Sequence, residues 1–169
     1  ETNENLKPSK PLSIIRKAPK SFTGRCLGIL VSEGSDAALF NGLKKTFEGE
    51  KASVRVIGPN VGEITLSDGS KVTVNEKIDG APSVLYDAVA VLTTGDVLKS
   101  MKDKPSFEAF YKDALVHGKF VAVANDVAKE LDPVKPVGTP KEQIIALSGA
   151  QDADEYLKAC RQLRTWAKE

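Results

Sequence analysis

The sequence of 169 residues contains few of the side chains that most often bind transition metals or act as nucleophiles. It has one histidine, two cysteines and one methionine, which leaves little with which to hold such a metal. Cys26 and Cys160 match the spacing of no zinc or redox motif, and each is predicted to serve as a small hydrophobic residue. His117 stands beside a glycine where a helix is predicted to end, a position that favours a positive charge. The sequence therefore predicts no metal site and no cofactor for this chain.

Long apolar runs and a strong charge of either sign are also missing. The longest uncharged apolar run is far shorter than the roughly 18 residues of a membrane span, and the N-terminus lacks the pattern of a signal peptide. The formal net charge is +1, so electrostatics give no reason to expect nucleic acid or a membrane surface as a partner. With 41% hydrophobic and 28% charged residues, the composition predicts an ordinary globular domain.

The first 24 residues differ from the rest and are predicted to be a linker or arm. Residues 1–25 hold six basic and two acidic residues, a net charge of +4, and three prolines without sustained apolar periodicity. This composition fits a solvated tether to an upstream domain, with a nucleic-acid-binding arm as the alternative. Two apolar segments are not needed by the predicted core and are candidates for a contact surface. They comprise Leu12, Ile14 and Ile15 in the arm and Pro133, Val134, Pro136 and Val137 in a proline-rich loop.

Residues 25–169 alternate short apolar strands with amphipathic helices, the pattern of parallel βαβ units. Strands are predicted at 26–31, 53–57, 87–93, 120–124 and 144–147, and helices after 35, from 105, at 125–131 and at 151–168. Asp68-Gly69 between two alternating runs predicts a hairpin after the second strand. The last helix is expected to bury Tyr156, Leu157, Cys160, Leu163 and Ala167. The predicted fold is an α/β, three-layer flavodoxin-like sandwich with a mostly parallel sheet and a small β-hairpin excursion.

Ligands of such a sheet bind at the carboxyl ends of its strands, so the loops that follow the strands are the candidate sites. Residues 32–36 could hold a phosphate or a flavin mononucleotide at a helix N-terminus, but they lack a glycine-rich motif and include Glu33 and Asp36. Capping of the helix is the alternative role. The loop after FVAVA would carry the nucleophile of a hydrolase or amidotransferase. It holds Asn125 and Asp126, neither of which can form an acyl-enzyme.

Several segments identify a family. GILVSEGSD, VIGPNVGEI with its hairpin, and IDGAPSVLYDAVAVL resemble the C-terminal flavodoxin-like domain of large-subunit monofunctional haem catalases, most closely the fungal members. HGKFVAVAND and the helical tail extend the resemblance over roughly residues 23–168. It implies a homotetrameric parent that dismutes hydrogen peroxide at a haem held by an N-terminal barrel, with residues 1–24 as the linker from that core. Export of the parent to the medium or the cell wall would agree with the fungal members.

The resemblance assigns this domain a non-catalytic role. Its partners would be the catalase core and the neighbouring subunits, and its role would be to stabilise the tetramer. The domain is also similar to the class I glutamine amidotransferase-like superfamily of peptidases, glyoxalases and holding chaperones, which place a cysteine at the strand-to-helix turn and an acid after the first strand. Glu33 is the candidate acid, whereas Asn125 stands where the cysteine would be. ATP-independent holding of unfolded clients needs no nucleophile. The alternatives are a free-standing superfamily enzyme of the glyoxalase or peptidase type and a flavin-binding electron carrier.

Overall fold

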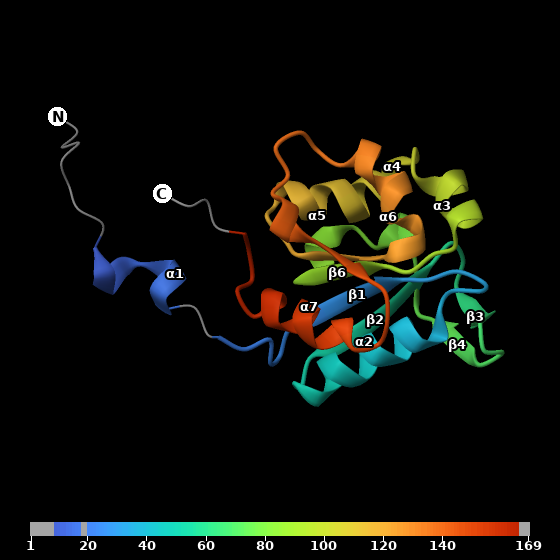
Figure 1. The fold of residues 1–169 in the computed structure, drawn as a ribbon, viewed down its shortest axis with the longest axis horizontal. Coiled ribbons are helices and arrows are strands. Elements are labelled where there is room, and N and C mark those ends of the chain that lie inside the picture. Colours follow the sequence, from blue (N-terminus) through green and yellow to red (C-terminus); the bar gives the residue numbers. More distant parts are fainter. Residues whose placement is uncertain (1–8, 18–19, 166–169) are drawn as a thin grey trace.

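A six-stranded parallel sheet forms the centre of the domain in the computed structural model, which describes residues 9–17 and 20–165 (Figure 1). The strand order is β5-β2-β1-β6-β7-β8, and every neighbouring pair is parallel. The strands are β1 (Cys26–Leu30), β2 (Ser53–Gly58), β5 (Glu76–Lys77), β6 (Ala88–Val91), β7 (Val121–Ala124) and β8 (Ile144–Leu147). β3 (Gly62–Thr65) and β4 (Lys71–Val74) form the separate antiparallel hairpin.

Helices cover both faces of this sheet and complete the predicted three layers. Figure 1 shows α2 (Ala37–Gly49) and α7 (Asp152–Cys160) on one face. The other face carries α3 (Gly95–Met101), α4 (Pro105–Phe107), α5 (Asp113–Val116) and α6 (Asn125–Leu131), with a π-helical turn (Glu108–Lys112) between α4 and α5. Short 3-10 turns occur at Lys10–Leu12, Ile78–Gly80, Ser83–Leu85, Asp132–Val134 and Lys141–Gln143, and α1 (Ile14–Lys17) lies in the arm. The flavodoxin-like α/β prediction is confirmed.

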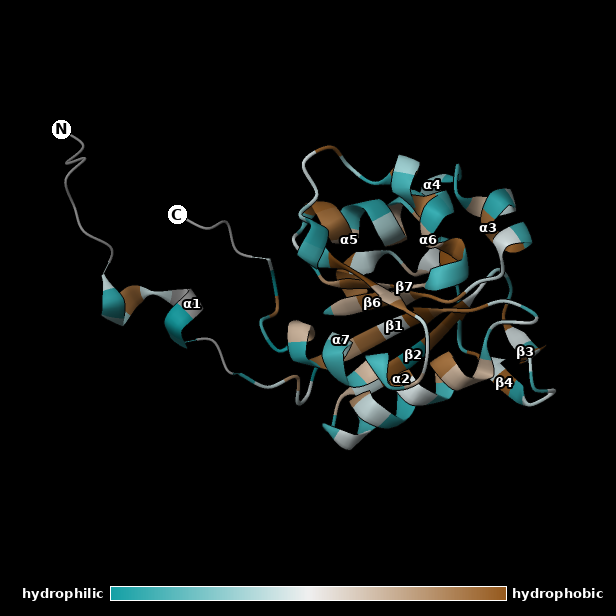
Figure 2. Cartoon of the chain, viewed as in Figure 1, coloured by the Kyte–Doolittle hydropathy of each residue, from teal (hydrophilic) through white to brown (hydrophobic). Residues whose placement is uncertain are grey.

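The three central strands are apolar along their whole length because both faces of the sheet are covered. Every residue of β6 and β7 is buried, and in β1 only Cys26 is partly exposed. Figure 2 shows these strands as the most hydrophobic elements, with polar residues on the outer sides of the helices. Such uninterrupted apolar runs are typical of parallel sheets buried on both faces.

Residues 32–36, between the first strand and α2, include a side chain that caps the helix. Asp36 is the N-cap, and its Oδ1 accepts a hydrogen bond of 2.8 Å from the backbone N–H of Leu39. The Ser35 hydroxyl accepts instead from the N–H of Ser32, also at 2.8 Å. These bonds satisfy backbone donors that would otherwise be unpaired at a helix start.

The last helix is shorter than the sequence predicts. Tyr156, Leu157 and Cys160 are buried as expected, but α7 ends at Cys160. Leu163 adopts a positive φ of 69° and is only half-buried, while Ala167 lies outside the described residues. Beyond the helix, the N–H of Thr165 donates 2.8 Å to the carbonyl oxygen of Gly118, a contact between distant segments that local periodicity does not encode. α3 and the two-residue strand β5 were not predicted.

The chain joins the folded domain before the first strand. The Phe22 side chain is fully buried and meets the Phe47 ring edge-on at a centroid distance of 5.2 Å. Its N–H donates 3.0 Å to the carboxylate of Glu50. Phe22 therefore packs with the core of the domain although it belongs to the predicted linker segment. None of the helices in the described residues is both long enough and apolar enough to cross a membrane.

Candidate functional site

The carboxyl ends of β1, β6 and β7 lie at one edge of the sheet, together with the β3–β4 hairpin. This edge is where a parallel sheet places its ligands. It brings together residues 32–36 after β1, residues 92–94 after β6 and the first residues of α6 after β7. Glu33 follows β1 and Asn125 follows β7, two strands that β6 separates, and both side chains are exposed.

Glu33 makes a structural contact with the hairpin. Its Oε2 accepts a hydrogen bond of 2.9 Å from the N–H of Thr65, and the carbonyl oxygen of Thr65 accepts 2.8 Å from the N–H of Gly34. Gly34 has a positive φ of 76°, a conformation that L residues rarely adopt. The carboxylate thus holds the hairpin against the end of β1.

Hydroxyl groups connect the ends of β1 and β6. The Ser32 hydroxyl accepts 3.1 Å from the N–H of Thr94, and the Ser67 hydroxyl accepts 3.0 Å from the N–H of Ala37. The hydroxyl of Thr93 is buried without a hydrogen-bond partner in the described structure. None of these contacts joins a nucleophile to a general base, the arrangement that acyl transfer requires.

Asn125 begins α6 directly after β7, so it lies at a strand-to-helix turn as the sequence predicts. Asn125 and Asp126 are both exposed first residues of this seven-residue helix. The carboxamide of Asn125 is not a nucleophile. The carboxylate of Asp126 cannot replace it, because consecutive residues of a helix project in different directions. The turn is present, but the side chain at its apex cannot start acyl transfer.

The two cysteines do not supply a replacement. Cys160 is buried in α7, and burial raises the pKa of its thiol well above the ordinary value, which disfavours the reactive thiolate. Cys26 is half-buried at the start of β1, at the opposite edge of the sheet from Asn125. Its N–H donates 3.0 Å to Oδ2 of Asp87.

The described residues gather no metal site, and two of the cavities offer no axial ligand for haem iron. Two cavities of about 590 and 570 Å³ have no His, Tyr, Cys or Met in their linings, and haem iron needs such an axial ligand. Two tyrosine hydroxyls already donate hydrogen bonds within the protein: that of Tyr86 to Glu76 at 2.6 Å and that of Tyr156 to the carbonyl oxygen of Val89 at 2.7 Å. Tyr111 lines a cavity of about 290 Å³. Within the described ranges, no three His, Cys, Asp or Glu residues gather as a metal site would require.

The predicted apolar contact residues differ in exposure. Leu12 is 80% exposed, Val137 and Pro133 are also exposed, and Val134 and Pro136 are half-buried in the proline-rich loop. The side chains of Ile14 and Ile15 lie outside the described residues. Val84, Leu85 and Val116 are exposed as well, although no sequence pattern predicts a contact surface there. Val116 and Val137 line the same 590 Å³ groove, a proximity between distant segments that no local pattern signals.

Comparison with solved structures defines the fold class as that of DJ-1 and ThiJ/PfpI proteins. Oxidized DJ-1 of Toxoplasma gondii matches 79% of this chain and 87% of its own with a TM-score of 0.60 and 16% identity. A ThiJ/PfpI domain protein from Brachyspira murdochii matches 83% of this chain and 96% of its own with a TM-score of 0.62 and 16% identity. At these identities the likeness concerns the fold alone.

Sequence comparison then identifies the family. The family described as the C-terminal domain found in long catalases matches residues 23–166, so the chain belongs to that family. Catalase C of Rhizobium meliloti (strain 1021) is 38% identical over 168 residues, 99% of this chain and 24% of that protein. Catalase HPII of Pseudomonas putida is 29% identical over 147 residues, 86% of this chain and 20% of that protein. The chain thus spans about a quarter or less of these relatives.

Proposed function

We propose that this chain is the non-catalytic C-terminal domain of a large-subunit catalase and that it stabilises the assembled enzyme. In that assembly the rest of the subunit would dismute hydrogen peroxide to water and oxygen at its own haem. The observation that carries the proposal is the family match over residues 23–166. The asparagine at the strand-to-helix turn supports a non-catalytic role, because the fold keeps the position of the nucleophile without a group able to attack.

A stabilising role follows from the physics of assembly. Whatever binds only the folded subunit shifts the unfolding equilibrium toward it, and permanent subunit interfaces bury on the order of 2,000 Å² or more. A folded domain of this size adds surface for such contacts. Its own core does not depend on them, since the central strands are already buried on both faces.

Deletion of residues 23–169 from the catalase subunit that carries them tests this role. We expect the truncated enzyme to keep its haem absorption and peroxide turnover at 25 °C. Its inactivation at elevated temperature and in urea should be several-fold faster. Asn125→Ala is the matched control, because it alters the superfamily position without removing the domain, and it should match the intact enzyme in both measurements. An unchanged inactivation half-life after deletion would overturn the stabilising role.

A second function, ATP-independent holding of unfolded proteins, is favoured by the exposed apolar residues. Val116 and Val137 line one groove, and exposed apolar surface is adhesive toward unfolded chains. We therefore expect the 169-residue chain to reduce the light scattering of a heated client protein without ATP. The double variant Val116→Asp, Val137→Asp should lose that effect.

The control for this assay is Val61→Asp, an equally polar change at an exposed valine before the hairpin, which should leave the effect intact. A variant lacking residues 1–20 tests the contribution of Leu12 and its neighbours. The absence of suppression at several-fold molar excess of the chain would remove the holding function.

A further inference from the structure

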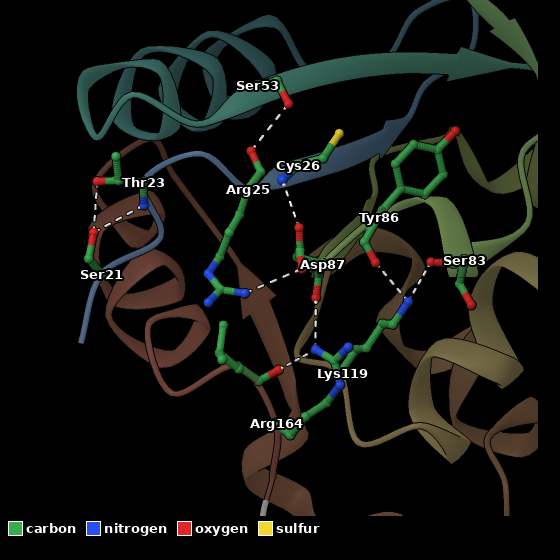
Figure 3. Close-up of polar contacts among 11 residues, drawn as sticks. Ser21, Thr23, Arg25, Cys26, Ser53, Ser83, Tyr86, Asp87, Lys119 and Arg164 are labelled. Atoms are coloured by element: carbon green, nitrogen blue, oxygen red, sulfur yellow. Dashed lines mark hydrogen bonds and ion pairs between the residues drawn. The ribbon is translucent and has the colours of Figure 1, made fainter. Parts of the chain in front are cut away.

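The opposite edge of the sheet, where the strands begin, carries a cluster of charged residues. Arg25 precedes β1, Asp87 precedes β6, Lys119 lies two residues before β7, and Arg164 follows α7. Figure 3 shows Asp87 between Arg25 and Arg164, with the Lys119 ammonium beside them and directed to the carbonyl oxygens of Ser83 and Tyr86. This edge is remote from Glu33 and Asn125, so the cluster is separate from the superfamily position.

Lys119 is buried, with 4% of its surface exposed. Its ammonium donates to the carbonyl oxygen of Ser83 and, at 2.7 Å, to that of Tyr86 (Figure 3). An ammonium group has three N–H donors, so these two bonds leave one over. Lys119 lines a cavity of about 330 Å³ together with His117 and Arg164.

The charges around this cavity do not balance. The only carboxylate of the cluster, Asp87, is occupied: Oδ1 lies 3.4 Å from Arg25, and Oδ2 accepts from the N–H of Cys26. The half-buried Arg164 donates only to carbonyl oxygens in its described contacts, 2.7 Å to Leu163 and 3.4 Å to Asp87. Among the residues that line this cavity, Arg164 and Lys119 are cationic and Asp87 is the one carboxylate, so there is one more positive charge than negative.

Positive groups withdrawn from water are costly unless an anion compensates them. We propose that Arg164 and Lys119 form a binding site for a carboxylate in this cavity. A guanidinium binds a carboxylate well because its parallel N–H groups match the two oxygens. Val84 and Leu85 also line the cavity and are 77% and 54% exposed, so the ligand class is a carboxylate on a short apolar chain.

The same chemistry has two sources, a free small acid and an acidic side chain of the rest of the catalase subunit. The cavity volume is at the lower end for small-molecule sites, which suits a free acid of a few carbon atoms. Arg25, a member of the cluster, lies close to the point where the polypeptide enters the domain, so upstream residues are also within reach. The site itself is proposed from the geometry of this chain and does not rest on the proposed function.

Titration of the 169-residue chain with butyrate at constant ionic strength tests the site. We expect saturable binding by calorimetry and a rise in melting temperature. Backbone amide signals of residues 84–87 and 117–119 should shift in the NMR spectrum. Butyramide, the neutral isostere, should have no effect. Arg164→Gln should weaken butyrate binding at least tenfold, whereas the control Arg55→Gln, at an exposed arginine elsewhere, should not.

Lys119→Met should weaken butyrate binding to a similar extent. If this substitution of a buried residue unfolds the chain, Arg164→Gln still tests the site. Equal effects of butyrate and butyramide, or full binding by Arg164→Gln, would overturn the proposal. The source is tested by repeating the titration on a catalase subunit that carries this domain. Binding to the 169-residue chain but not to that subunit identifies an acidic side chain as the ligand, and equal binding to both identifies a free acid.

Discussion

The carboxylate of Glu50 and the guanidinium of Arg161 form a two-point ion pair across 111 residues of sequence. Nε of Arg161 lies 2.9 Å from Oε1 of Glu50, and the second nitrogen contacts Oε2. Because Oε1 also accepts from the N–H of Phe22, one carboxylate joins three segments: the start of the domain, the end of α2 and the end of α7. The Arg161 hydrogen bond is the largest cause that lowers the pKa of Glu50 to about 2.

This pair predicts a loss of stability in acid. The folded-state pKa of Glu50 lies below its ordinary value of 4.5, so the carboxylate stabilises the fold above about pH 4.5 and progressively less down to pH 2. Allowing for screening at a partly exposed pair, we expect a contribution of about 2 kcal/mol. Urea unfolding from pH 6 to pH 2 should show a shallower decline for Glu50→Gln than for the parent chain. The control is Glu63→Gln, which removes an exposed pair with Lys71 and should follow the parent curve.

Gly28 in β1 has no room for a side chain. A Cβ there would lie 2.8 Å from Cγ of Tyr86 and 3.0 Å from Cδ1 of Ile57. We expect Gly28→Ala to cost about 1–3 kcal/mol in the free energy of unfolding, because the closely packed ring must move. Gly49→Ala is the control: nothing lies within 4 Å of its Cβ, and alanine restricts the unfolded chain, so this variant should be slightly more stable. Equal stability of the two variants would show that the Tyr86 ring yields freely.

The Glu33 contact predicts a local effect on the hairpin. Glu33→Ala removes the acceptor for the N–H of Thr65, so hydrogen exchange of that amide should accelerate while exchange in the buried strands stays unchanged. Global stability should fall by less than about 1 kcal/mol, since this backbone group is exposed to water. Glu33→Gln keeps an oxygen acceptor and should exchange at an intermediate rate. Identical exchange in all three chains would show that the bond is not formed in solution.

The buried Lys119 should contribute more to stability as the pH rises in the basic range, whereas Glu50 contributes less as the pH falls in the acidic range. Burial, reinforced by Arg164 and opposed by Asp87, lowers the pKa of Lys119 to about 8. The unfolded chain therefore holds this proton at pH values where the folded chain has released it, so the Lys119 contribution to stability rises between pH 8 and about pH 10.4. Cys160 and Tyr86 oppose this rise because their folded-state pKa values are raised. The stability difference between the parent and Lys119→Met should widen in favour of the parent by up to about 3 kcal/mol over this range. A stability difference between the parent and Lys119→Met that stays constant over this pH range would contradict the prediction.

Elements whose residues carry their own signal could be predicted from the sequence. β1, β6 and β7 are continuous apolar runs, and Asp68-Gly69 marks the hairpin between β3 and β4. β5 has two residues and no periodicity to detect, and the segment after α7 bonds through Thr165 to Gly118, a residue distant in the sequence. Asn125 was correctly located at the start of a helix after a strand, since both the buried run and the following helix pattern are local.

The cluster at the starts of the strands was missed because its members lie far apart in the sequence. A signal was nevertheless present. Arg25 and Asp87 each stand directly before a buried strand, and Lys119 stands before the apolar run that contains β7. Since parallel strands all begin at one edge of the sheet, charged residues in these positions must converge. What the sequence could not tell is that the Asp87 carboxylate bonds to Arg25 and Cys26, while the described hydrogen bonds of Arg164 and Lys119 go to carbonyl oxygens.

Asp87 also has a topological consequence. Its carboxylate contacts Arg25, directly before β1, and its carbonyl oxygen accepts from Arg164, near the end of the described structure. Both ends of the fold therefore converge on a single residue. A short loop from residue 165 back to residue 25 would leave every strand pair of the sheet in place, and the exposed turn at Asp68 and Gly69 is a site where the chain could be reopened. The fold therefore does not depend on where the chain starts and stops. The domain could be inserted into a loop of a larger protein as readily as it could be attached at one end.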